Sequence, residues 1–357
     1  MFQSFYVLEN KILGRGLSGP VYLGKDVAND KYVALKHFPK NIKDNQKIIN
    51  EISIPLEFDQ ENLVKMFGIA EIDNKKYLVF EYCKGGDLSR YLRYFKRFEE
   101  SEVQNFMRQI LRGLNVLHSN NIIHHDIKPG NILVELIPFN INNKSNNEEK
   151  NKFDKILDEF LELTDNKKNI EEIKNSNINK DYIFQSLKHS ILKLSDFGLS
   201  KFKECNNEKI RGGTELYMDP NLFRSDVDVI TIEDPKVDIW SVGIVAYELF
   251  FGKKPFDSRE ALSKGTYTID LKECKQISKP FLSFLNMCLQ RRQIMRANCQ
   301  FLLDSEFITR DSYLFEYIDQ NNLNEIEFPN KDYVKDNKII MSIDDNRSIN
   351  IKFDIGK

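Results

Sequence analysis

Two short loops carry three oxygen-bearing side chains, and each loop adjoins a short predicted strand. The segment 124–131 (HHDIKPGN) contains Asp126 and Asn131, and the segment 195–198 (SDFG) contains Asp196. Carboxylate and amide oxygens, together with phosphate oxygens, are the ligands that Mg²⁺ prefers. A lone Asp-Phe-Gly is ordinarily a turn, but the two segments in this order predict a fold in which the three side chains converge on metal and phosphates.

A glycine cluster near the beginning of the chain points to the same chemistry. The segment 14–21 (GRGLSGPV) places Gly14, Gly16 and Gly19 between two predicted strands. Glycines at this spacing let a strand–turn–strand unit close over phosphates, because a Cβ atom would keep the backbone away. A plain β-turn explains the cluster equally well, whereas a dinucleotide-binding fingerprint requires a following helix that this sequence lacks.

The next strand favours the phosphate-binding interpretation. The segment 33–36 (VALK) places Lys36 at the end of a predicted buried strand, where the alternative is a solvated surface lysine. A buried amine needs an anionic partner. Glu51, in the predicted helix that follows, is the candidate.

In this order the motifs resemble a eukaryotic-type protein kinase, and the resemblance covers Tyr6 to Ile308. It implies an α+β bilobal fold, with a β-rich N-terminal lobe (6–83) and a mostly helical C-terminal lobe (87–308). Lys128 and the pair Gly213-Thr214 resemble the serine/threonine-specific kinases. Within these, the segment 77–88 is similar to the autophagy-initiating and calmodulin-kinase-like groups.

The resemblance implies three sets of site residues, with ATP and Mg²⁺ as cofactors and proteins as substrates. The catalytic residues are Asp126, Lys128, Lys36 and Glu51. The ATP-binding residues are Gly14, Gly16, Gly19, Val21, Ala34, Lys36, Glu81, Cys83 and Leu133. The metal ligands are Asn131 and Asp196.

The same resemblance gives the catalytic residues their roles. Lys36, held by Glu51, binds the α- and β-phosphates. Asp126 accepts or orients the proton of the substrate hydroxyl, and Lys128 neutralises charge on the transferred phosphoryl group. The adenine is sandwiched by three apolar residues, which are Val21, Ala34 and Leu133. Its edge is bound by the backbone of two residues that follow Phe80, which are Glu81 and Cys83.

The sequence departs from the kinase pattern at three positions. His125 replaces the arginine that usually precedes the catalytic aspartate. Pro55 is expected to end or kink the helix that carries Glu51. Asn221 stands where a glutamate usually pairs with Arg296, so we expect only a neutral hydrogen bond there, weaker than a charge-assisted one.

Composition restricts the partners and the compartment. Lys plus Arg is 52 against 54 for Asp plus Glu, so the formal net charge of −2 provides no global field for nucleic acid or an anionic membrane. Five scattered cysteines suggest neither a disulfide framework nor a zinc site, and they favour a reducing compartment. The first eleven residues lack the layout of a signal peptide, and the apolar segment 239–251 contains Glu248, so it is predicted as a buried helix. We expect a cytoplasmic protein, with the nucleus as an alternative.

An insertion at 136–190 and a tail at 311–357 flank the core motifs. The run 140–152 is rich in Asn, Lys and Glu and is predicted to be disordered. After it, five apolar residues fall on one helix face that either docks on its own domain or binds a regulatory partner; they are Phe153, Ile156, Leu157, Phe160 and Leu161. In the tail, the alternating segments 338–343 and 348–355 predict a β-hairpin.

Three functions remain open from the sequence. The first is an active serine/threonine kinase, and the second is a pseudokinase scaffold that binds partners through its fold and insertion. Scaffolds commonly lose at least one catalytic position, and here all six are present: Lys36, Glu51, Asp126, Lys128, Asn131 and Asp196. The third is a small-molecule kinase, which the peptide-docking segment 213–220 argues against.

Overall fold

A computed structural model describes the chain over residues 5–16, 19–38, 45–137, 147–164, 178–202, 214–223, 234–264, 266–270, 277–311, 334–335, 338–343 and 349–354. The chain divides into two compact units. The first unit is Met1–Phe95 with Pro129–Ser200, and the second is Lys96–Lys128 with Lys201–Lys357.

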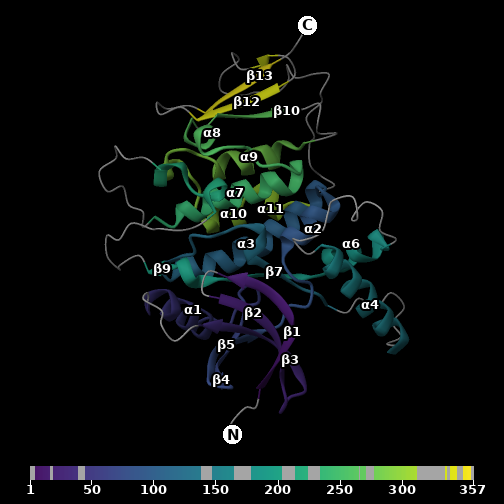
Figure 1. The fold of residues 1–357 in the computed structure, drawn as a ribbon. Coiled ribbons are helices and arrows are strands. Elements are labelled where there is room, and N and C mark those ends of the chain that lie inside the picture. Colours follow the sequence, from purple (N-terminus) through teal and green to yellow (C-terminus); the bar gives the residue numbers. More distant parts are fainter. Residues whose placement is uncertain are drawn as a thin grey trace. The chain divides into compact units, whose positions relative to one another are not determined.

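The first unit contains an antiparallel sheet of five strands in the order β1-β2-β3-β5-β4 (Figure 1). The strands are β1 (Phe5–Gly16), β2 (Gly19–Asp26), β3 (Lys31–Phe38), β4 (Met66–Ile72) and β5 (Lys75–Glu81). Alternate residues of β3 and β5 form its core, with Val33, Leu35, Tyr77 and Val79 all buried. A period of two is typical of strands that place one face on a core.

The turn between β4 and β5 consists of two residues, Asp73 and Asn74. Asp73 and Asn74 have φ values of 52° and 60°, and Ile72 pairs with Lys75. Two consecutive positive φ values match a type I′ turn, whose twist suits an antiparallel hairpin and which Asp and Asn tolerate.

The helix that carries Glu51 corrects one prediction. Helix α1 spans Asn45–Glu57 with Pro55 inside it, so the proline does not stop the helix. The amide of Phe58 even donates to the Ile54 carbonyl at 3.2 Å. Pro55 lies in the last turn, where a single lost N–H leaves the preceding turns of the helix intact.

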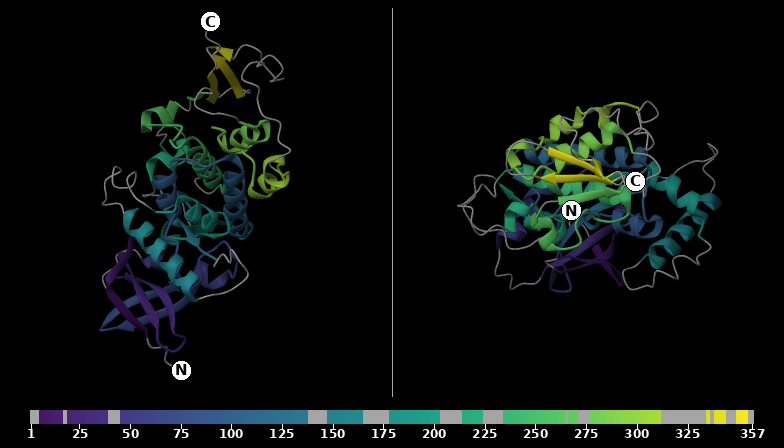
Figure 2. Two further views of the ribbon diagram at one scale, coloured as in Figure 1. Left: turned by 90° about the vertical axis from the view of Figure 1, so that its right-hand side faces the viewer. Right: turned by 90° about the horizontal axis from the view of Figure 1, so that it is seen from above.

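The first unit also contains α2 (Leu88–Phe95), β7 (Ile132–Glu135) and β8 (Ile191–Leu194), and β7 and β8 form a two-stranded sheet. Between these two strands the chain forms α4 (Asn147–Leu163) and α6 (Lys180–Lys188), which lie side by side in Figure 2. The rings of Phe153 and Tyr182 join them, with centroids 5.5 Å apart. The α4 helix packs against α2 through Phe160, so the helix docks on its own unit, the first of the two alternatives.

The prediction of a disordered run at 140–152 is wrong for its second half. Residues 147–152 belong to α4, whereas 138–146 lie outside the described residues. The start of the helix reads NEEKNK, in which Glu and Lys are good helix formers.

The second unit is mostly helical (Figure 1). Its helices are α3 (Glu100–Ser119), α7 (Lys236–Phe251), α8 (Arg259–Lys264), α9 (Lys279–Cys288), α10 (Cys299–Leu303) and α11 (Glu306–Thr309), and its short strands β6 (Ile122–Ile123) and β9 (Lys201–Phe202) pair. Helix α7 is buried from Val237 to Phe250, as predicted. Within the described ranges, no helix combines the length and the apolar character needed to cross a membrane.

The sequence did not indicate β10 (Thr266–Asp270), which lies in a region predicted to be helical. It pairs antiparallel with β12 (Lys338–Ile343), which in turn pairs with β13 (Ile349–Asp354), and β11 (Val334–Lys335) completes the sheet. The two segments predicted as a hairpin correspond to β12 and β13; the turn between them, 344–348, lies outside the described residues.

Candidate active site

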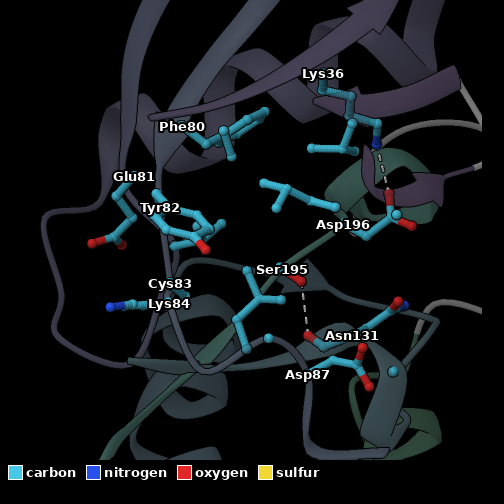
Figure 3. Close-up of a pocket in the computed structure, with 18 of the residues that line it drawn as sticks. Lys36, Phe80, Glu81, Tyr82, Cys83, Lys84, Asp87, Asn131, Ser195 and Asp196 are labelled. Carbon is cyan, nitrogen blue, oxygen red and sulfur yellow. Dashed lines mark hydrogen bonds and ion pairs between the residues drawn. The ribbon is translucent and has the colours of Figure 1, made fainter. Parts of the chain in front are cut away.

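The first unit contains a cavity of about 560 Å³ that collects most of the predicted nucleotide-binding residues (Figure 3). The predicted residues that line it are Gly14, Val21, Ala34, Lys36, Glu51, Glu81, Cys83, Asn131, Leu133 and Asp196. Gly19, which the structure describes, is not among the lining residues. The side chains come from β1, β2, β3, α1, β5 and the ends of β7 and β8.

Lys36 lies between two carboxylates at one end of this cavity. Its Nζ atom is 2.8 Å from Glu51 Oε1. It is also 3.0 Å from Asp196 Oδ1, the contact that is dashed in Figure 3. Burial lowers the pKa of Lys36, but Asp196 and Glu51 more than offset this effect and hold the pKa above its ordinary value of 10.5. The lysine is therefore a fixed cation in a buried place.

Gly198 makes room for Glu51. A Cβ atom on Gly198 would lie 2.5 Å from Glu51 Oε1, closer than real Cβ contacts. The short 3₁₀ turn Phe197–Leu199 follows Asp196, whose φ of 66° is left-handed. Any side chain at position 198 would push the Glu51 carboxylate away from Lys36, which explains why the sequence has glycine here.

Strand pairing brings Asn131 close to Asp196. Ile132 of β7 pairs with Leu194 of β8, so Asn131, just before one strand, meets Ser195, just after the other. The backbone amide and the Oγ of Ser195 donate to the Asn131 carbonyl at 2.9 and 3.0 Å (Figure 3). Asn131 and Asp196 both line the cavity, and they provide the amide and carboxylate oxygens that suit Mg²⁺.

Sequence reasoning missed part of the lining at the opposite end. The segment after β5 contributes Tyr82 and Lys84 as well as the predicted Glu81 and Cys83, and Asp87 and Arg90 follow. Three residues of the insertion, Asp158, Leu161 and Glu162, also line the cavity. Burial, and secondarily Asp158, raises the pKa of Tyr82 to about 12.

The remaining predicted catalytic residues, Asp126 and Lys128, lie in the second unit and contact each other. Lys128 Nζ donates to Asp126 Oδ2 at 2.7 Å and to Thr214 Oγ1 at 2.8 Å. Asp126 is buried, and its backbone amide lies 3.3 Å from His124 Nδ1. The convergence of Asp126 with Asn131 and Asp196 stays a prediction, because those two residues belong to the first unit.

A buried aspartate holds the loop that carries Asp126. Asp238 Oδ2 accepts from the amide of His124 and Oδ1 accepts from the amide of His125, both at 2.8 Å. His118 Nε2 lies 2.9 Å from Asp238 Oδ2, and its Nδ1 lies 3.3 Å from Cys299 Sγ. Nothing in the sequence pattern had indicated His118 or Cys299.

The two histidines of this network titrate in opposite directions. Burial lowers the pKa of His118, but Cys299 and Asp238 more than offset it and raise the pKa to about 10. Burial dominates at His125 and lowers its pKa to about 4. His118 is therefore cationic and His125 neutral near pH 7.

These shifts predict how the melting temperature depends on pH. The stabilisation from His118 is present below pH about 6.5 and is lost as the pH rises through 10. The stabilisation from His125 is present above about 6.5 and is lost as the pH falls towards 4. In a plot of melting temperature against pH, we expect His118→Gln to flatten the alkaline limb. We expect His125→Gln to flatten the acidic limb. Unchanged limbs in calorimetric melts from pH 5 to 9 would contradict this.

The arginine predicted to lack a charged partner has one. Arg296 Nη1 forms an ion pair with Asp219 Oδ2, and neither side chain is exposed. Asn221 does not bond to Arg296 as expected; its Nδ2 donates to Asp219 Oδ1 and to the Arg291 carbonyl, both at 2.8 Å. The carboxylate that pairs with Arg296 therefore lies two residues before position 221, where the kinase pattern places it, and the pair is still charge-assisted.

Comparisons with known proteins agree with this geometry. The protein kinase domain model matches residues 7–308. Calcium-dependent protein kinase 4 and calcium-dependent protein kinase 6 of Plasmodium berghei (strain Anka) are each 29% identical over 84% of this chain, covering 48% and 17% of their own lengths. Mitogen-activated protein kinase kinase kinase YODA of Arabidopsis thaliana is 25% identical over 84% of this chain and 29% of its own length.

The chain thus spans less than half the length of these curated relatives. The five-stranded sheet and the helical second unit agree with the α+β bilobal fold of the family. With a family match that covers most of its length, the chain belongs to the protein kinases.

Proposed function

We propose that the chain is a serine/threonine protein kinase that transfers the γ-phosphoryl group of Mg·ATP to protein hydroxyls. The observation that carries this proposal is the cluster of the buried Lys36 and Glu51 with the partly buried Asp196 at the end of the 560 Å³ cavity. A cation fixed by two carboxylates in a cavity of nucleotide size suits a polyphosphate. Magnesium, when bound through the oxygens of Asn131 and Asp196, would neutralise charge on the phosphates.

Each residue of the proposed site has a separate role. Lys36 binds phosphate oxygens, and Glu51 keeps its amine in place. Asn131 and Asp196 provide the oxygens that hold the metal. Asp126 accepts the proton of the substrate hydroxyl, and Lys128, whose amine contacts Asp126, neutralises charge on the transferred group.

The likeness to serine/threonine kinases supports hydroxyl acceptors of that kind. We also propose a cytoplasmic location, in keeping with the free thiols of Cys83, Cys288 and Cys299. The scaffold alternative loses one of its supports, because the apolar face of α4 packs on α2 and is not presented to a partner helix. A regulatory partner at the tail or elsewhere on the insertion remains a proposal.

The direct test is transfer from γ-labelled ATP to a pooled peptide library, followed by phosphoamino-acid analysis. We expect phosphoserine and phosphothreonine, with incorporation that requires Mg²⁺ and is lost in Asp196→Asn. Label on tyrosine alone would contradict the specificity, and Mg-independent label in Asp196→Asn would contradict the assignment of the site.

We further predict that activity does not require phosphorylation of the segment that follows Asp196. In kinases that require it, the phosphate pairs with an arginine before the catalytic aspartate. Here that position is the buried His125, whose lowered pKa of about 4 leaves it neutral and without a guanidinium fork. Phosphatase-treated protein, shown by mass spectrometry to be unmodified at Ser200 and Thr214, should keep its rate. A drop of about tenfold or more, the size of a lost charge-assisted contact, would show that phosphorylation is needed.

A further inference from the structure

Helix α4 of the insertion is packed into the first unit along one of its faces. Leu157, Phe160 and Thr164 have no exposed surface. The ring of Phe160 lies between two rings of α2, with centroids 4.8 Å from Tyr91 and 5.3 Å from Tyr94. Residues at 157, 160 and 164 share a helix face, so burial of this face fixes the rotation of α4.

Polar contacts fix the end of α4 as well. Arg90 Nη1 donates to the Leu161 carbonyl at 2.9 Å, and Arg93 Nη1 donates to the Thr164 carbonyl. Both arginines come from α2 and meet the carbonyl end of α4, where the helix dipole is negative. Lys84, just after β5, pairs with Asp154. These contacts make α4 an integral part of the first unit.

The neighbouring face of α4 lines the cavity. Asp158, Leu161 and Glu162 have the i, i+3, i+4 spacing of one helix face, and all three are lining residues. Leu161 Cδ2 lies 3.2 Å from where a Cβ atom on Gly86 would be. The Leu161 side chain therefore packs against the segment that follows β5. Lys36 and Asp196, the proposed phosphate and metal groups, lie together elsewhere in the cavity.

We propose that α4 is the outer wall of the nucleotide pocket, and that Leu161 is a specificity-determining contact for the nucleoside part of the nucleotide. This inference rests on the proposed function, because it takes the cavity to be an ATP site. It gives the insertion a role in ligand binding that the protein kinase match does not assign.

The charges around α4 indicate which end of the nucleotide faces it. Two of the cations that line the cavity beside α4 are already engaged, since Arg90 Nε contacts Asp87 Oδ2 at 3.3 Å and Lys84 pairs with Asp154. Asp158 and Glu162 add negative charge at the same rim. A triphosphate is repelled from such a rim and attracted to Lys36, so the uncharged nucleoside lies against Leu161.

The test is a pair of matched substitutions on α4, Leu161→Trp and Glu159→Trp. Glu159 is exposed and does not line the cavity. Calorimetric titrations of the whole chain would use Mg·ATP and adenosine as ligands. We expect Leu161→Trp to weaken both by the same factor, at least about fivefold, because the larger ring enters the cavity. Glu159→Trp should stay within about twofold of the wild type, as surface substitutions usually do.

Two further variants keep the test decisive. Lys36→Ala should weaken Mg·ATP much more than adenosine, since it removes only the phosphate contact. Leu161→Ala, which is expected to fold if Leu161→Trp does not, should weaken both ligands about threefold through lost apolar contact. In turnover assays, Leu161→Ala should raise KM for ATP with little change in kcat.

Several outcomes would overturn the proposal. Wild-type affinity in both Leu161 variants would show that α4 is not part of the pocket. Loss of affinity for Mg·ATP but not for adenosine would place α4 at the phosphate end instead. If the Leu161 variants bind adenosine more weakly than the wild type, as expected, but the wild type transfers no phosphate, the proposed function is overturned and the role of α4 in the pocket still holds.

Discussion

Asp126→Asn is expected to reduce the rate of phosphoryl transfer by about 10²- to 10⁴-fold, the contribution of one positioned acid–base group. An amide keeps the shape of the side chain and still accepts the hydrogen bond from Lys128 Nζ, now 2.7 Å from Asp126 Oδ2. It cannot accept the proton of a substrate hydroxyl. The rate is measured with γ-labelled ATP and a peptide substrate at saturating concentrations of both.

The matched control is Asp59→Asn, at a position whose side chain is 84% exposed and pairs with Lys65 on the surface. This variant should retain wild-type activity, and both variants should bind Mg·ATP normally, because the role proposed for Asp126 is on the acceptor side. Equal phosphate incorporation by the wild type and Asp126→Asn would contradict the assigned role.

Asp219→Asn is expected to lower the free energy of unfolding by about 3–5 kcal/mol, the usual effect of removing one partner of a buried ion pair. Asp219 and Arg296 are both fully buried, so the guanidinium would be left without its carboxylate in a place that water does not reach. Gln293 Nε2 also donates to Asp219 Oδ2 at 2.9 Å and would lose a charged acceptor. Urea denaturation followed by circular dichroism measures the change.

The double variant Asp219→Asn with Arg296→Gln separates charge from packing. Because it removes the uncompensated cation, we expect it to be more stable than Asp219→Asn alone. Asn221→Ala, which leaves the ion pair in place, should have a smaller effect of about 1–2 kcal/mol, typical of a neutral hydrogen bond. A single Asp219→Asn variant within about 1 kcal/mol of the wild type would mean that another group compensates Arg296.

The contact between Lys36 and Glu51 could be predicted because local sequence determined both elements. Lys36 lies near the end of β3 (Lys31–Phe38), and Glu51 lies in α1, the helix that follows. The sequence also placed Asn131 and Asp196 beside two short strands, but the pairing of these strands, which brings the two residues together, joins segments about sixty positions apart. Where a side chain and its strand or helix lie together in the sequence, the geometry follows from the period of the element.

The partner of Arg296 could not be predicted in this way. A family pattern fixes which position usually carries the carboxylate, but any carboxylate that reaches the buried guanidinium satisfies it. Asp219 does so from two residues before Asn221. Asp219 is present in the sequence, but the prediction considered only position 221, where the kinase pattern usually has the carboxylate.

Long-range pairing accounts for the other differences. The helix face of α4 was evident from Phe153 to Leu161, but the sequence did not show that α2 would cover one side and the cavity the other. The strand β10 is short, and its pairing with β12 joins residues about seventy positions apart, which no local period reveals. Both features depend on tertiary contacts, which override local propensity.

The most direct test of the proposed activity is a single-turnover experiment, with the purified chain in excess over γ-labelled ATP, Mg²⁺ present and peptide substrate at saturation. Rapid quenching follows the label from bound ATP to peptide. An active kinase predicts that the label appears on serine or threonine at a rate that Asp126→Asn reduces by about 10²-fold or more. ATP that stays bound and intact in the wild type, with a time course identical to that of Asp126→Asn, would contradict catalysis and indicate a nucleotide-binding scaffold.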